Sequence, residues 1–332
     1  MASRKRTAVV AVGGNSLITD PAHQSIPDQY RAAATTAQHI AEMVVAGWNV
    51  VVTHGSGPQV GFILRRSEIA IDEVPPVPMD YAAADLQGAI GYMFQRALRN
   101  EFRRRGVARR AATVVTQVLV DRADMAFADP TKPIGSYMDA ATARRRADEL
   151  GWIVREDAGR GWRRVVPSPL PQSIVEIEEI DHLVKAGYVV IACGGGGIPV
   201  CQDTGGDLEG VEAVIDKDLA SSMLARELDA DLLLISTGVE KVAIGFGRPG
   251  QRWLERITRP EAEAHLAAGE FAEGSMAPKI RAIIAYLDRP GRTGLITDPP
   301  NIGRALEGRA GTTIVFESPR DAPSHGGVAQ HI

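Results

Sequence analysis

The chain has 332 residues, 45% of them hydrophobic, and a formal charge of −4 from 37 basic and 41 acidic side chains. This length and apolar content allow a large core, either in one α/β unit or in two smaller domains. The slight acidic excess argues against a nucleic-acid-binding protein, which normally carries a strong basic excess, and nothing in the charge balance indicates a membrane surface.

The N-terminal segment and the cysteines indicate a cytoplasmic protein. The apolar run after the first basic residues is short and ends in glycines, which is not typical of a signal peptide. No stretch approaches the roughly 18 apolar residues of a membrane helix. The chain has two cysteines, Cys193 and Cys201, which excludes a disulfide framework and a multi-cysteine zinc site. We therefore expect a reducing, cytoplasmic environment.

Short β-branched runs that end in glycine-containing turns alternate with helical stretches along the chain. In chain order, the sequence predicts a strand at 7–14, a helix at 28–46, a strand at 48–57, a helix from Pro58, a helix at 85–105, strands at 112–120 and 188–197, a helix at 217–228, a strand at 229–237, a helix at 276–287, and strands at 292–298 and 311–316. Continuous apolar strands between amphipathic helices are typical of a mostly parallel sheet covered on both faces. Ligands of such sheets bind at the carboxyl ends of the strands.

The segment 121–168 interrupts this pattern. It contains the proline-flanked loop ADPTKPIG, a polar helix, and two short β runs around 158–161 that predict a hairpin. We expect a small lid subdomain here, inserted into a single domain that spans 1–332. The tail 318–332 is polar and rich in Pro and Gly, which predicts disorder.

Three glycine-rich turns follow predicted strands. They comprise Gly13, Gly14 and Asn15; Gly55, Ser56 and Gly57; and the run of four glycines that begins with Gly194 and Gly195. Each turn offers backbone N–H groups without a Cβ in the way, and a helix that begins just after such a turn adds a positive dipole end. Any one of them could be a tight turn and nothing more. Three such turns at equivalent strand ends favour a site for phosphate oxygens.

A dinucleotide-binding turn is an alternative for the second of these turns. Glycines at 55, 57 and 61 in GSGPQVG approach the G-x-G-x-x-G fingerprint. However, prolines break the segment 72–81, and no strand that ends in Asp or Glu follows within about 20 residues. The P-loop pattern is also absent, so the sequence favours neither a dehydrogenase nor a P-loop kinase.

Three lysines could supply the positive charge that phosphoryl transfer requires. Lys217 lies between two aspartates where a helix begins, and Asp218 could hold a lysine ammonium group by ion pairing. Lys279 also lies at a helix start, where a cation opposes the helix dipole and needs another reason to be present. Lys132 lies in the proline-flanked loop of the expected lid and could enter the site on closure. Each of them could instead be an ordinary surface lysine.

Two further features near strand ends allow more than one interpretation. The turn after the strand at 229–237, formed by Thr237, Gly238 and Val239, could hold a nucleotide base or ribose, or could be a plain strand-end turn. His54 precedes Gly55, and a core or turn histidine is the better interpretation than a catalytic base. We find no Ser/His/Asp or Cys/His set.

Together, these residues resemble the carbamate kinases, a branch of the amino acid kinase family, over nearly the whole chain. The most specific matching stretches are PTKPIG, EDAGRGWR, CGGGGIPV and VEAVIDKD. The resemblance implies a three-layer αβα sandwich around a mostly parallel sheet of about eight strands, with a protruding lid at 121–168, and a homodimer. It also implies reversible, Mg²⁺-dependent phosphoryl transfer between ATP and carbamate, giving ADP and carbamoyl phosphate, usually in arginine or purine catabolism.

The resemblance assigns roles to the candidate residues. Lys132, Lys217 and Lys279 would neutralise phosphate charge, with Asp218 orienting the lysines. The three glycine turns would contact carbamate and the transferred phosphoryl group, and no protein metal site is expected because the nucleotide phosphates would hold Mg²⁺. The residues expected to face the nucleotide are Thr237, Gly238, Val239 and Met276.

The sequence departs from the family pattern at two serines. Ser56 stands where asparagine is usual and Ser16 where alanine is usual, and the shorter side chain of Ser56 could leave room for a larger acid or a water molecule. A kinase for a related small carboxylate- or carbamate-type acid is therefore the alternative. A non-catalytic nucleotide sensor on this fold would be expected to lose one of the four charged residues, and all four are present.

Overall fold

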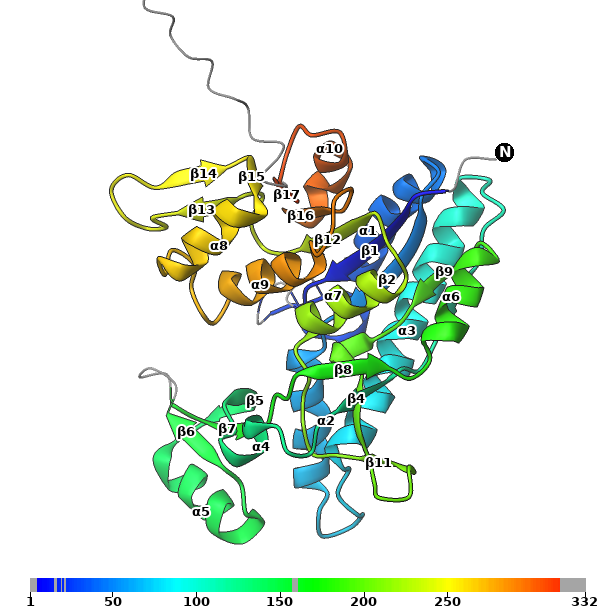
Figure 1. Cartoon of the computed structure of the whole chain (residues 1–332). Coiled ribbons are helices and arrows are strands. Elements are labelled where there is room, and N and C mark those ends of the chain that lie inside the picture. The colour runs from blue at the N-terminus through cyan, green and yellow to red at the C-terminus, as the bar shows by residue number, and fades with distance from the viewer. Residues whose placement is uncertain (1–4, 15–16, 19, 21, 157–160, 317–332) are drawn as a thin grey trace, which may run out of the picture.

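An eight-stranded sheet forms the centre of the molecule (Figure 1). The computed structural model describes residues 5–14, 17–18, 20, 22–156 and 161–316. The strand order is β15 (Arg256–Thr258), β17 (Thr312–Val315), β16 (Thr293–Thr297), β12 (Leu232–Ser236), β1 (Thr7–Val12), β2 (Asn49–His54), β9 (Val189–Ile191) and β3 (Ala111–Thr113). From β16 to β3 all neighbours are parallel, whereas β17 is antiparallel to β16. The predicted mostly parallel sheet of about eight strands is confirmed.

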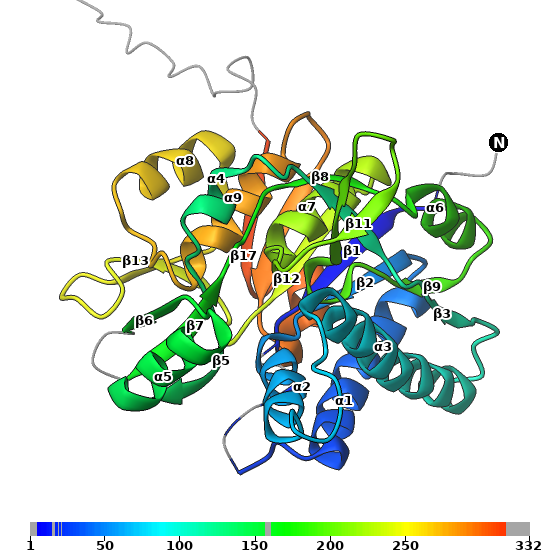
Figure 2. The same ribbon diagram turned by 90° about the horizontal axis from the view of Figure 1, so that it is seen from below.

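Helices cover both faces of the sheet, as Figure 2 shows. One face carries α1 (Ile26–Val45), α3 (Met79–Arg104) and α10 (Ile302–Leu306), and the other carries α6 (Ile177–Lys185), α7 (Lys217–Glu227), α8 (Arg259–Ala267) and α9 (Met276–Tyr286). Successive strand residues divide between the two cores, because side chains alternate along a strand. Val10 packs in the core with α1 and α3, and its neighbour Val9 packs in the core with α7 and α9. The three-layer αβα sandwich is confirmed.

The stretch predicted as one strand at 112–120 is two strands in different sheets. β3 belongs to the central sheet, and β4 (Gln117–Val120) pairs in a four-stranded sheet ordered β11 (Leu208–Gly210), β10 (Ile198–Gln202), β4 and β8 (Pro171–Ile174). The buried side chain of Gln87 causes the break. Its Oε1 accepts from the N–H of Thr116 at 2.6 Å, and its Nε2 donates to the carbonyl of Thr116 at 3.0 Å. A side chain thus satisfies the N–H of Thr116 between the two strands, and the carbonyl of Thr116 also accepts from the N–H of Ile198 in β10 at 2.9 Å.

The segment expected to form a lid stands at one end of the sandwich in Figure 1. It contains a three-stranded antiparallel sheet of β5 (Lys132–Met138), β7 (Trp162–Val166) and β6 (Val154–Glu156), with α4 (Met125–Ala128) and α5 (Ala140–Leu150). The turn of the predicted β6–β7 hairpin and the tail 318–332 lie outside the described residues. β5 approaches α2 (Gly57–Ile69) closely, because a Cβ on Gly61 would lie 2.9 Å from the Cα of Gly135.

Two smaller features complete the fold. β13 (Val242–Ile244) and β14 (Arg252–Leu254) form an antiparallel pair that the sequence did not predict. Helix α3 begins at Met79, several residues before the predicted start, directly after Pro78. Across the described part of the chain, no helix combines the length and the apolar character needed to cross a bilayer.

Two glycines of α3 should respond in opposite ways to alanine. A Cβ on buried Gly91 would lie 2.3 Å from Cγ2 of Thr113, whereas a Cβ on exposed Gly88 would have nothing within 4 Å. We expect Gly91→Ala to lower the free energy of unfolding by about 1–3 kcal/mol through overpacking. Gly88→Ala should raise it by up to about 1 kcal/mol, because alanine favours a helix. Urea unfolding of both variants checks this, and equal effects would contradict the described packing of α3 on β3.

Candidate active site

A cavity of about 1080 Å³ opens at the carboxyl ends of the central strands. Ser56 follows β2, Gly195 follows β9 and Thr237 follows β12, so three parallel strands present their ends to it. Residues of α7 and α9 line one side, and Lys132 of β5 lines the side formed by the lid segment. This is the place at which open α/β sheets bind their ligands.

Asp218 holds two ammonium groups side by side in this cavity. Its Oδ1 lies 2.6 Å from Nζ of Lys217, and its Oδ2 lies 2.9 Å from Nζ of Lys279. The Asp218 residue is only 4% exposed. Burial by itself raises the pKa of this carboxyl group, but the charges of Lys217 and Lys279 outweigh burial and hold the pKa well below its usual range. The carboxylate therefore stays ionised and can orient both lysines.

The start of α7 explains why these charges lie together. Asp216 is the N-cap of the helix, and its Oδ1 accepts from the backbone N–H of Asp218 at 2.9 Å and of Leu219 at 3.3 Å. The other oxygen of Asp216 lies 3.0 Å from Nζ of Lys132. One helix start thus binds a lysine of the lid segment through Asp216 and two lysines of the sandwich through Asp218.

The structure brings the predicted glycine turns into direct contact. A Cβ on Gly55 would lie 2.5 Å from the backbone nitrogen of Gly14, so Gly55 tolerates no side chain. Gly195 has a φ of +71°, and a Cβ on it would lie 2.6 Å from Oγ of Ser56. Three turns that are far apart in the sequence therefore meet, two through their backbones and the third at the side chain of Ser56.

The predicted substrate-binding residues differ in their access to the cavity. Gly55, Ser56, Gly57 and Gly195 line it. Gly13 and Gly14 support this wall from behind, and the N–H of Gly13 donates to the carbonyl of Ser236 at 3.2 Å. Asn15, like Ser16, lies outside the described residues.

Gly194 is a packing position. A Cβ on Gly194 would lie 2.3 Å from Nε2 of His54, and the residue is absent from the described lining of the cavity. His54 is 1% exposed and stacks on Phe94 with ring centroids 6.2 Å apart. The glycine run therefore combines two tasks: Gly194 makes room for the histidine ring, and Gly195 faces the cavity.

The predicted nucleotide-facing residues are divided in a similar way. Thr237 lines the cavity, and its N–H donates to the carbonyl of Thr297 at 2.8 Å. Gly238 and Val239 continue the turn but do not line the cavity as described, and Met276 packs against the apolar core beneath α9.

Two arginines of this cavity were not predicted from the sequence. Arg163 lies in the EDAGRGWRR stretch on β7, and Arg281 lies two residues after Lys279. Arg281 forms a two-pronged ion pair with Glu273, with N–O distances of 2.7 and 2.6 Å. Both arginines lie close to motifs that match the family, and this closeness could have identified them as site residues. Arginines in runs of basic residues, however, are usually interpreted as surface groups.

The acidic groups here are engaged by lysines. Among the described residues, no group of three or more His, Cys, Asp or Glu side chains gathers in a way that could hold a metal ion. Asp216 and Asp218 each contact an ammonium group instead. The donor set of the cavity is thus suited to anions such as phosphates.

Comparison with known proteins agrees with this geometry. A model of the amino acid kinase family matches residues 6–298, and the chain belongs to this family, which makes it a phosphotransferase. Within the family it is similar to carbamate kinases, as the sequence predicted. The carbamate kinase of Pyrococcus horikoshii is 46% identical over 308 residues, which cover 92% of this chain and 98% of that protein.

Two other relatives bear on the site. The carbamate kinase-like protein YahI of Escherichia coli is 48% identical over 314 residues, covering 94% of this chain and 99% of that protein. The structure of the carbamate kinase from Giardia lamblia bound to AMP-PNP matches with a TM-score of 0.89 at 40% identity, covering 95% of this chain and 100% of that one.

Removing the charge of Asp218 should destabilise the fold. Asp218→Asn leaves two lysines near each other without their carboxylate, and we expect a loss of about 3 kcal/mol in the free energy of unfolding at pH 7. Urea unfolding measures it, with exposed Asp72→Asn as the control. A loss of less than about 1 kcal/mol would mean that the lysines do not depend on Asp218.

His54 should make stability depend on pH. Burial lowers its pKa to about 4, the hydrogen bond to Gly55 opposes this, and the charge of Lys217 lowers it further. The unfolded chain takes up this proton near pH 6.5, so the stabilisation present above pH 6.5 is lost as the pH falls towards 4, by about 3 kcal/mol in total. His54→Gln should flatten the plot of unfolding free energy against pH in this window. Parallel plots for both proteins would contradict the buried, neutral ring.

Proposed function

We propose that this protein catalyses reversible phosphoryl transfer between ATP and carbamate, giving ADP and carbamoyl phosphate. The ion-paired cluster of Lys217, Asp218 and Lys279 beside the glycine turns carries the proposal, because it presents oriented positive charge to a backbone-lined anion site. The names of the relatives support it, and the Giardia lamblia protein was solved with AMP-PNP, a nucleotide.

The chemistry requires charge neutralisation and alignment. A carbamate oxygen attacks the γ-phosphorus of ATP, the new P–O bond forms, and the bond from this phosphorus to the β-phosphate bridging oxygen breaks, leaving ADP. Carbamate is already an anion, so no general base is needed. This agrees with a cavity in which His54 is buried and neutral behind Gly194 and Gly195.

Each part of the cavity has a task in this proposal. Lys217 and Lys279 neutralise the transferred phosphoryl group, and Asp218 keeps them aligned. The backbone N–H groups of the turn at 55–57 and of Gly195 hold carbamate, and Thr237 faces the nucleotide. Mg²⁺, held mainly by the nucleotide phosphates, would reduce their charge.

Lys132 connects the lid segment to the reaction. It lies at the start of β5 and contacts Asp216, so its ammonium group is already at the cavity before substrate binds. Phosphate oxygens would compete with Asp216 for this group and draw the lid segment over the reactants. The homodimer and the role in arginine or purine catabolism stay predictions of the resemblance, and the cytoplasmic location stays a prediction from the N-terminal segment and the cysteines.

A related acid is the second candidate acceptor. Ser56 lines the cavity where the family usually has asparagine, and the carbamate kinase-like protein YahI is as similar to this chain as the carbamate kinases are. Overall sequence identity to these relatives therefore does not decide whether the phosphoryl acceptor is carbamate or another small carboxylate-type acid.

A coupled assay tests both candidates. The purified protein is mixed with Mg²⁺, ADP and either carbamoyl phosphate or acetyl phosphate, and ATP formation is followed. We expect rapid ATP formation from carbamoyl phosphate. Faster formation from acetyl phosphate would favour the second candidate, and no ATP from either, in a folded protein that binds ADP, would overturn the proposal.

Lys132→Ala should separate catalysis from binding. Loss of a cation that contacts the transferred group should lower kcat by about 100-fold or more, while the Kd of ADP changes by less than about threefold. Exposed Lys185→Ala is the matched control and should change neither. Loss of ADP binding with kcat retained would contradict the proposed task of Lys132.

A further inference from the structure

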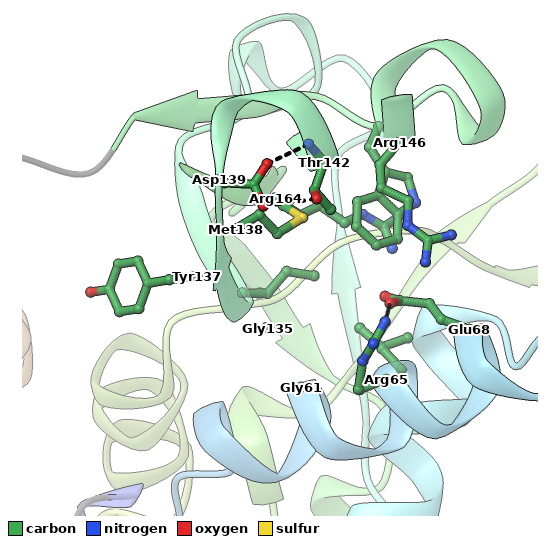
Figure 3. Close-up of a pocket in the computed structure, with 13 residues that line it drawn as sticks. Gly61, Arg65, Glu68, Gly135, Tyr137, Met138, Asp139, Thr142, Arg146 and Arg164 are labelled. Carbon is green, nitrogen blue, oxygen red and sulfur yellow. Dashed lines mark hydrogen bonds and ion pairs between the residues drawn. The ribbon is translucent and has the colours of Figure 1, made fainter. Parts of the chain in front are cut away.

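A second cavity, of about 350 Å³, lies between helix α2 and the lid segment (Figure 3). Leu64, Arg65 and Glu68 of α2 form one wall, and residues of β5, α5 and β7 form the others. Of the residues that line the two cavities as described, Ile134 alone is shared. This second cavity is therefore separate from the first. It lies beside the part of β5 that follows Ile134, whereas Lys132 begins the strand at the first cavity.

The charged groups around it are unevenly paired. Its lining contains three guanidinium groups, of Arg65, Arg146 and Arg164, and two carboxylates, of Glu68 and Asp139, and Glu212 outside the lining pairs with Arg164. Arg65 lies 3.0 Å from Glu68. Asp139 is the N-cap of α5 and accepts from the N–H of Thr142 at 2.8 Å. Both carboxylates thus already have partners.

Arg146 and Arg164 have less compensation. Among the described residues, no carboxylate lies within 4.0 Å of Arg146, whose guanidinium carbon lies 5.8 Å from the ring centroid of Trp152. Figure 3 shows Arg146 reaching from α5 towards Arg65 and Glu68 across the cavity. Arg164 lies 4.9 Å from the same ring and 3.4 Å from Glu212, a carboxylate that is itself 58% exposed.

Burial makes the position of Arg164 costly. Its side chain is 21% exposed, and this desolvation lowers the pKa of its guanidinium group despite the nearby charges of Glu212 and Glu68. A half-buried guanidinium group with one 3.4 Å contact to an exposed carboxylate keeps N–H donors for an anion.

We propose that this cavity binds a small organic monocarboxylate with an aliphatic or aromatic body. The ligand carboxylate would be the partner that Arg146 lacks among the described residues, and a planar carboxylate matches the fork of a guanidinium group. Leu64, Ile134 and Met138 supply an apolar lining for the body of the ligand. The volume lies within the range of small-molecule sites.

Such a ligand would bridge two parts of the molecule. Its carboxylate would contact arginines of α5 and β7, and its body would pack against Leu64 of α2. It would thereby tie the lid segment to the sandwich next to the strand that begins with Lys132. The inference rests on these contacts and does not depend on the identity of the phosphoryl acceptor.

Phenylacetate is a suitable probe, with phenylacetamide as its uncharged match. Trp152 lines the cavity, so tryptophan fluorescence should report binding. We expect a saturable change with phenylacetate, at least about tenfold weaker binding of phenylacetamide, and a loss of the signal in Trp152→Phe. A linear, non-saturating response to phenylacetate would overturn the proposal.

Matched variants locate the binding. Arg146→Ala should weaken phenylacetate binding by about tenfold or more, because it removes a charged hydrogen-bond donor. Arg144→Ala, an exposed arginine on the same helix, and Lys132→Ala, in the other cavity, should leave it unchanged. If Arg146→Ala does not fold by circular dichroism, Arg146→Gln carries the test. Equal affinity in the Arg146 and Arg144 variants, or loss of binding in Lys132→Ala, would overturn the proposal.

Discussion

Two ammonium groups that lie in one cavity repel each other, and the buried carboxylate of Asp218 is what keeps them together. Its two oxygens contact Lys217 at 2.6 Å and Lys279 at 2.9 Å. Burial without these partners would drive the carboxyl group towards its neutral form, so the charge of Asp218 depends on the two lysines. The beginnings of α7 and α9 must therefore lie side by side, which fixes how these helices pack on the sheet.

The glycine turns satisfy the complementary requirement. Positive charge at the cavity is useful only if the anions come close to the backbone, and a side chain on Gly55 or Gly195 would enter space that Gly14 or Ser56 already occupies. The run of four glycines also serves the core, because Gly194 leaves room for the His54 ring. In this short segment, Gly194 is therefore required by the packing of the core and Gly195 by the shape of the cavity.

Much of this could be predicted from the sequence, because the signals were local. Apolar runs with glycine turns predicted the central strands, and aspartates next to Lys217 predicted its ion pair. Other features depend on residues far apart in the chain. Gln87 divides the stretch at 112–120, and the contact of Lys132 with Asp216 joins residues 84 positions apart. The arginine-lined cavity between α2 and the lid segment exists only because α2, β5, α5 and β7 meet there.

The central claim is that Lys217 and Lys279, aligned by Asp218, contact the phosphoryl group while it is transferred. A crystal structure with ADP, Mg²⁺ and tetrafluoroaluminate, a mimic of the transferred phosphoryl group, tests it most directly. The account predicts both ammonium nitrogens within about 3 Å of the mimic or its bridging oxygens, with both ion pairs to Asp218 retained. A mimic bound elsewhere in the cavity, with either lysine turned away from it, would contradict the account.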